Sequence, residues 1–172
     1  MYFFTVVTYG RRPILVTEDG RRFLKQAIET VRADWPFELF ANVLLPDHWH
    51  LVMSLPAGDE HFAPRMKRIK QEFTGAWLGA GLPEARVSRA KRKRGERGIW
   101  QPRFWEHSIR DAEDLERCCD YIHWNPRKHQ LVARVQDWPW SSFFRFVRKG
   151  AYSIDWGGTE PNSIHGHNQW GE

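Results

Sequence analysis

The sequence predicts an α+β fold, with an antiparallel sheet of the ferredoxin-like, split βαβ type and helices packed against it. Two observations carry this prediction. Stretches rich in β-branched and aromatic residues alternate with stretches in which apolar residues recur every three or four positions. In chain order they give strand, helix, strand, strand, helix, loop, strand and helix, which matches a split βαβ arrangement. We expect the helices to lie on one face of the sheet.

The first third of the chain supplies one helix and three strands. Residues 2–9 are rich in β-branched and aromatic side chains, and residues 20–33 place apolar side chains at helical spacing. Residues 37–45 and 48–55 are apolar runs separated by a Pro-Asp turn, which predicts a β-hairpin.

The remaining elements are spaced more widely. We expect a helix at 60–79, a mobile loop at 79–98, a strand within 99–110 and a helix at 112–124. An Asn-Pro pair directly after that helix is expected to end or bend it. A short last helix through about 148 follows an aromatic turn.

Length and composition indicate one domain. The 172 residues suffice for a sizeable core, and we expect residues 1–149 to form it, with a basic loop at 84–98 and a loosely held tail at 150–172. No apolar run approaches the roughly 20 residues of a membrane span, so we expect no membrane partner and a cytoplasmic location. The two cysteines, Cys118 and Cys119, are adjacent, which argues against a disulfide framework and a Cys-rich zinc site.

One stretch places two histidines on either side of a large apolar residue, His48-Trp49-His50. On a strand, side chains alternate between faces, so both imidazoles point the same way and Trp49 points to the other face. Two imidazoles on one strand face can bind one metal ion. The spacing alone favours the alternative of two half-exposed histidines on an edge strand.

A second stretch offers a nucleophile. Tyr121 and Asn125 are four residues apart and share one helix face if the helix continues that far. The tyrosine hydroxyl is a candidate nucleophile, and the amide oxygen is a candidate ligand for a hard cation. A tyrosine at the edge of the core with its hydroxyl in water is the alternative.

Positive charge gathers in one segment. The chain carries a net charge of +5, and residues 86–97 alone hold seven basic side chains against one acidic one. Such a patch is typical of a protein with a polyanionic partner, although a solvated charged loop has the same composition.

Four blocks of the sequence closely resemble the REP-associated tyrosine transposases, which belong to the single-tyrosine HUH group of single-strand DNA transposases. The resemblance covers residues 2 to about 147. The blocks are Leu-Pro-Asp-His-Trp-His-Leu-Val at 45–52, Trp-Gln-Pro-Arg-Phe-Trp-Glu-His-Ser-Ile-Arg at 100–110, Tyr-Ile-His-Trp-Asn-Pro-Arg-Lys-His at 121–129 and Asp-Trp-Pro-Trp-Ser-Ser at 137–142.

The resemblance implies nicking and joining of single-stranded DNA at hairpin-forming, REP-like sequences. His48 and His50 would hold one divalent ion, Mg²⁺ or Mn²⁺, with Asn125 as a third ligand. Tyr121 would attack the phosphate and form a 5′-phosphotyrosyl intermediate, which conserves the bond energy for rejoining. The resemblance leaves open whether the protein acts as a monomer or a homodimer.

The basic segment is the expected DNA contact. We expect five of its side chains to bind DNA phosphates: Arg89, Lys91, Arg92, Lys93 and Arg94.

Two other functions fit parts of the sequence. A non-catalytic single-stranded nucleic-acid-binding module would need only the basic loop and the aromatic residues, and neither the histidines nor the tyrosine. A metal-dependent hydrolase would use water as the nucleophile and would form no covalent adduct.

The other histidines carry weaker expectations. His107 lies in a matched block and could sit near the site, whereas His123 should face away from Tyr121 and serve the structure. Ordinary surface or core roles are expected for His61, His129, His165 and His167.

Overall fold

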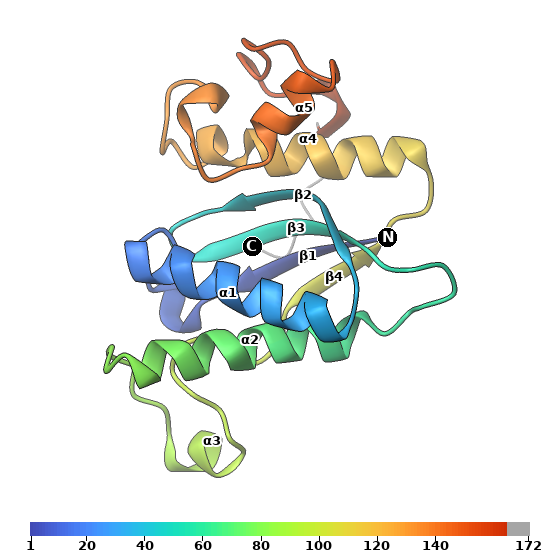
Figure 1. The fold of residues 1–172 in the computed structure, drawn as a ribbon. Coiled ribbons are helices and arrows are strands. Elements are labelled where there is room, and N and C mark those ends of the chain that lie inside the picture. Colours follow the sequence, from blue (N-terminus) through green and yellow to red (C-terminus); the bar gives the residue numbers. More distant parts are fainter. Residues whose placement is uncertain (165–172) are drawn as a thin grey trace.

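The computed structural model describes residues 1–164, so His165, His167 and the rest of the expected tail from residue 165 lie outside the described residues (Figure 1). A four-stranded antiparallel sheet forms its centre, in the order β2-β3-β1-β4. This confirms the ferredoxin-like prediction. The strands are β1 (Tyr2–Val7), β2 (Glu38–Leu44), β3 (His48–Ser54) and β4 (Trp105–Ser108).

Helices cover both faces of the sheet. Helices α1 (Glu18–Asp34) and α2 (Phe62–Gly79) pack together on one face, and α4 (Ala112–Lys128) crosses the other, with α5 (Phe143–Arg148) next to it (Figure 1). The prediction of helices on one face is therefore wrong. The reason lies in β1 and β3, whose successive apolar side chains are buried on both sides and require a covering layer on each.

Strand alternation divides the core in two. Phe4 and Trp49 point toward α1 and α2, whereas Phe3 and Val52 point toward α4. The second core also contains Cys118, and the other apolar side chains of α4 close it.

Helix α4 is longer than predicted. It starts where the Asp111 carboxylate accepts a hydrogen bond from the Asp114 backbone N–H at 2.8 Å, and it continues through Pro126 to Lys128. Proline lacks an N–H donor and its ring crowds the carbonyl four residues earlier, which commonly ends or kinks a helix, yet its φ is helical and α4 continues past Pro126 for two more residues. The backbone N–H of His129 still bonds to the Asn125 carbonyl at 3.0 Å.

The basic loop is more ordered than predicted. It contains the short helix α3 (Arg89–Lys93), capped by Ser88, and its two ends are tied by a 3.0 Å backbone bond from Ala85 to Gly98. A Cβ atom on Gly98 would lie 2.0 Å from the Ala85 carbonyl oxygen, so only glycine allows this approach.

The outer edge of β2 is covered by the segment that leads into α5. The Leu44 N–H bonds to the Trp140 carbonyl at 2.8 Å, and the Ser142 N–H bonds to the Asn42 carbonyl at 2.8 Å. Trp138 adds a 3.0 Å hydrogen bond from its indole to the Leu44 carbonyl. The aromatic turn predicted from the sequence thus forms hydrogen bonds along the outer edge of β2.

The beginning of the expected tail is packed. Tyr152 donates a 2.8 Å hydrogen bond to Asp120 on α4 and stacks on Phe146 of α5, and Ser163 also bonds to Asp120. Up to residue 164, therefore, the segment is not loosely held. Within residues 1–164 there are also three 3₁₀ helices: Tyr9–Arg11, Val135–Asp137 and Asn162–Ile164.

None of the helices within residues 1–164 combines the length and the apolar composition that crossing a bilayer requires.

Trp49 should contribute strongly to stability, because its indole is 1 % exposed between β3 and the helices on that face. We expect Trp49→Ala to lower the free energy of unfolding by about 3–5 kcal/mol, through reduced burial and a cavity. Urea unfolding followed by circular dichroism measures this. Trp35→Ala is the matched control, since Trp35 is 42 % exposed and should change little. An equal loss of unfolding free energy in the two variants would contradict the prediction that Trp49 is an important core residue.

Candidate active site

The two histidines of β3 lie side by side beneath α4. The register pairs His48 with Val7 and His50 with Thr5 of β1, which puts both imidazoles on the face that α4 covers. Both are buried, and their ring centroids are 4.8 Å apart. The alternation predicted from the sequence is confirmed, and the alternative of half-exposed histidines on an edge strand is wrong because β3 is an inner strand.

Each imidazole is held by a polar neighbour at Nδ1. His48 Nδ1 lies 2.7 Å from an Asp47 carboxylate oxygen, and His50 Nδ1 lies 2.9 Å from the Thr5 hydroxyl. Burial would raise the pKa of Asp47, but its hydrogen bonds to His48 and Arg11 outweigh burial and lower it to about 2. A carboxylate or hydroxyl at Nδ1 fixes the ring orientation, so a metal would be bound through Nε2.

Helix α4 places Tyr121 directly above this pair. The Tyr121 side chain is buried, its ring centroid lies 5.2 Å from that of His50, and its edge packs against Phe3. Asn125, one turn later, is also buried because α4 continues past it. The structure thus brings Tyr121 to the His48–His50 pair from a stretch about seventy residues away, and Asn125 is buried one turn farther along the same helix.

The donor set fits a divalent ion. The two imidazoles are neighbours on β3, and the Asn125 amide is buried on α4. Imidazole with oxygen ligands suits Mn²⁺, and Mg²⁺ less well. The half-buried Asp47 carboxylate next to His48 supports a cation there, because it supplies negative charge behind the ligand.

Two residues near the site were missed by the sequence reasoning. The Lys128 ammonium donates a hydrogen bond to the Tyr121 hydroxyl at 3.0 Å and lies 4.7 Å from the ring centroid. The ring of His129 lies 5.1 Å from that of His48. Both follow the proline at which the helix was expected to end. If the predicted helix had continued past the proline, Lys128, seven residues after Tyr121, and His129, four residues after Asn125, would have been expected on the same helix face as those residues.

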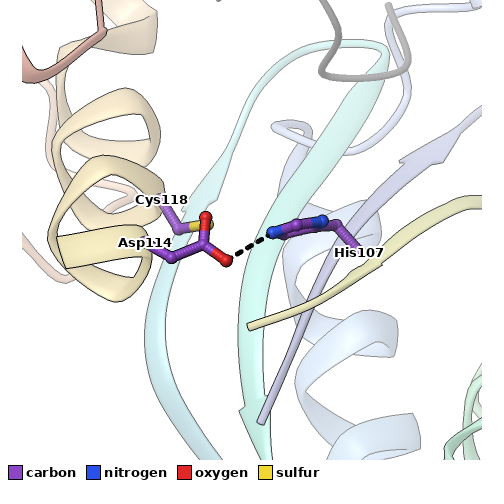
Figure 2. Close-up of side chains that lie close together, drawn as sticks. All are labelled: His107, Asp114 and Cys118. Atoms are coloured by element: carbon purple, nitrogen blue, oxygen red, sulfur yellow. Dashed lines mark hydrogen bonds and ion pairs between the residues drawn. The ribbon is translucent and has the colours of Figure 1, made fainter. Parts of the chain in front are cut away.

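A second polar cluster lies farther along α4 toward its N-terminus (Figure 2). His107 Nε2 is 2.7 Å from the Asp114 carboxylate. Within residues 1–164, His107, Asp114 and Cys118 are the group that could bind a metal by proximity, because their potential ligand atoms all lie within 4.8 Å of one another. Arg110 and Arg117 also contact the Asp114 carboxylate, at 3.3 and 3.4 Å.

These contacts favour an ion-pair cluster over a metal site. Two guanidinium groups already neutralise Asp114, and burial raises the pKa of the Cys118 thiol, which disfavours the thiolate that a metal requires. Burial alone would raise the pKa of Asp114, but the Arg110 backbone N–H, His107 and the Arg110 side chain lower it to about 2. The cluster therefore ties the start of α4 to β4.

His123 faces away from the sheet, as expected. Its Nε2 lies 2.7 Å from the Ser142 hydroxyl and its Nδ1 lies 3.2 Å from that of Tyr152. Burial, with help from the Arg145 guanidinium, lowers its pKa to about 3, so it is neutral at physiological pH. This supports a structural role between α4, α5 and the segment after α5.

The structure does not bring the basic loop to the His48–Tyr121 site. Helix α3 lies beyond α2, on the opposite side of the sheet from α4 (Figure 1). Three of the five expected DNA-binding residues make contacts within the described chain: Lys91 with Tyr9, Arg92 with Glu84 at 3.3 Å, and Arg94 with Glu96 at 2.8 Å. The other two, Arg89 and Lys93, are exposed.

A groove of about 730 Å³ runs between α2 and the chain that follows α3. Its cationic lining is Lys67, Lys70, Arg94 and Arg97. Burial lowers the pKa of Lys70 to about 8, and its ammonium is held by the Gln101 carbonyl at 2.7 Å. Two basic residues of the loop, Arg94 and Arg97, thus face two lysines of α2 across a groove.

Comparison with known proteins identifies the family. The family model for "Transposase IS200 like" matches residues 1–125. The REP-associated tyrosine transposase of Escherichia coli (strain K12) is 43% identical over 157 residues, covering 91% of this chain and 84% of that protein. The chain belongs to the REP-associated tyrosine transposases of the IS200-like family.

Two more transposase relatives agree. A Haemophilus influenzae protein assigned to the same group is 42% identical over 168 residues, covering 96% of this chain and 92% of that one. The solved structure of a REP-associated tyrosine transposase bound to a REP hairpin superimposes with a TM-score of 0.78 at 40% identity, covering 99% of this chain and 90% of that chain.

The Asp114 cluster should make the transposase sensitive to acid. A carboxylate whose pKa is lowered on folding stabilises the protein above its unfolded pKa of roughly 4, and this contribution disappears as pH falls toward 2. We expect Asp114→Asn to lower stability at neutral pH and to flatten the decrease in stability between pH 4 and about 2. Thermal melts across that range test this, with Glu113→Gln as an exposed neighbouring control. Parallel curves for wild type and Asp114→Asn would contradict it.

Proposed function

We propose that this transposase nicks and rejoins single-stranded DNA at hairpin-forming, REP-like sequences, with Tyr121 as the nucleophile. The observation that carries the proposal is the placement of the Tyr121 ring 5.2 Å from His50, over a pair of imidazoles 4.8 Å apart. A nucleophile and a paired-histidine site in contact are what phosphoryl transfer at one phosphate requires. The hairpin is proposed because the related protein of known structure is bound to one.

His48, His50 and Asn125 are the proposed ligands of one Mg²⁺ or Mn²⁺ ion. When bound, the ion would neutralise charge on the scissile phosphate and on the departing 3′-oxygen. The protein's own part is to hold both imidazoles, through Asp47 and Thr5, and to aim Tyr121 at the same point. The Tyr121 oxygen forms the bond to phosphorus as the bond to the 3′-oxygen breaks, which leaves a 5′-phosphotyrosyl link and a 3′-hydroxyl.

The basic side chains are proposed to hold the DNA outside the reacting phosphate. Arg89, Lys91, Arg92, Lys93 and Arg94 lie on or next to α3, beside the cationic groove along α2. Because α3 and Tyr121 are on opposite sides of the sheet, the bound DNA would have to wrap around the molecule. We propose a cytoplasmic location, where a DNA substrate is accessible. The protein is proposed to act as a monomer or a homodimer.

The nucleophile can be tested by covalent adduct formation. A single-stranded hairpin oligonucleotide incubated with the protein and Mn²⁺ should give a protein–DNA adduct on a denaturing gel. We expect Tyr121→Phe to abolish the adduct, and His48→Ala or removal of metal with EDTA to reduce it at least about 10²-fold. Tyr2→Phe is the matched control, because Tyr2 belongs to the other face of the sheet.

The same gel separates the alternatives. DNA cleavage without any adduct in the wild type would favour a hydrolase that uses water. Binding without cleavage, unchanged by Tyr121→Phe, would favour a non-catalytic binding module. An adduct that survives Tyr121→Phe would reject Tyr121 as the nucleophile.

The role of the basic residues can be tested by the salt dependence of binding. Replacing Lys91, Arg92, Lys93 and Arg94 by Gln should reduce the slope of log affinity against log salt by up to about 0.7 for each DNA phosphate that these side chains neutralise. Fluorescence anisotropy with the catalytically inactive Tyr121→Phe protein measures it. Exposed Arg148 and Lys149 on the other side of the molecule provide the control pair. An unchanged slope would remove α3 from the DNA interface.

A further inference from the structure

We propose that Lys128 is a catalytic residue, whose ammonium stabilises negative charge on the Tyr121 oxygen during both cleavage and rejoining. This inference rests on the proposed function, in which that oxygen is the reacting atom. The Lys128 ammonium donates a hydrogen bond to it at 3.0 Å. Lys128 lies in the 121–129 block of the family resemblance, but sequence reasoning assigned it no role because the predicted helix ended before it.

The backbone of α4 explains how Lys128 reaches the site. Residues seven apart on an α-helix lie on the same face, two turns apart. Tyr121 and Lys128 stay on one helix only because α4 continues through Pro126. Lys128 is an exposed residue at the C-terminal end of the helix, and its side chain extends back over the tyrosine ring, with the ammonium 4.7 Å from the ring centroid. The ammonium therefore contacts both the ring and the oxygen of the nucleophile.

The reaction places negative charge on that oxygen in both directions. In cleavage, the phenolic proton passes to solvent, the Tyr121 oxygen bonds to phosphorus, and the 3′-oxygen leaves and takes a proton from solvent. In rejoining, the 3′-hydroxyl attacks, loses its proton, and the Tyr121 oxygen leaves with the bonding electron pair. An ammonium fixed 3.0 Å from the atom that carries charge in each transition state lowers both barriers.

A role in DNA binding alone predicts a different result. A lysine that merely contacts a phosphate changes affinity and its salt dependence and leaves the rate of the bound complex unchanged. A catalytic lysine changes the rate of the bound complex and leaves affinity almost unchanged. The two roles therefore separate when the rate is measured at saturating DNA.

The experiment measures single-turnover adduct formation at saturating hairpin oligonucleotide with Mn²⁺. We expect Lys128→Met to slow cleavage by about 10²-fold, the effect typical of removing one donor to a developing oxyanion. Rejoining, started by adding a 3′-hydroxyl oligonucleotide to isolated adduct, should slow by a similar factor. Lys128→Arg should restore part of both rates. Lys149→Met, an exposed lysine after α5, is the matched control.

Affinity and folding are measured in parallel, by anisotropy and by thermal melting. Unchanged rates at saturating DNA, or a defect confined to affinity, would overturn the role of Lys128 while leaving Tyr121 as the nucleophile. If Lys128→Met does not fold, Lys128→Gln replaces it, because glutamine also removes the ammonium charge and the same rates can be compared. An adduct that persists in Tyr121→Phe would instead overturn the proposed function itself.

Discussion

The alternation of side chains along β3 is the constraint on which the rest of the structure depends. The strand is buried on both faces, so a register shift of one residue would exchange the indole of Trp49 and the two imidazoles between the two helix layers. Trp49 fills the core beneath α1 and α2, and His48 and His50 meet α4. A tryptophan that fills one core therefore holds the two polar rings in place on the other face.

Helix α4 depends on that strand and completes it. Its sheet-facing residues contact His107 of β4 through Asp114 and His50 of β3 through Tyr121, so polar side chains occur along an otherwise apolar interface. On the outer face of the helix, Asp120 and His123 bond to Tyr152 from the segment after α5. The helix that carries the proposed nucleophile is thus held from both sides, which limits how far Tyr121 can shift relative to the histidines.

Local patterns predicted much of this arrangement. The His-x-His spacing, the β-rich stretches and the helical stripes depend on residues close in sequence, and they predicted the sheet and the shared face of His48 and His50. What they missed depends on distant partners. The position of α4 on the second face follows from burial of β1 and β3 on both sides, and the contact of Lys128 with Tyr121 follows from a helix that tolerates Pro126. The distance of α3 from the site is likewise a property of the whole fold.

The segment that pairs with β2 has a consequence for assembly. An exposed edge strand offers its backbone to any other strand, and many proteins join their sheets in this way. Here residues 140–142 already occupy hydrogen-bonding positions along β2, and Trp138 seals its end. A second copy of the chain could extend the sheet past β2 only by displacing this segment. The protein is thereby protected on that side against strand-to-strand aggregation, and any dimer that uses β2 must be built from side chains.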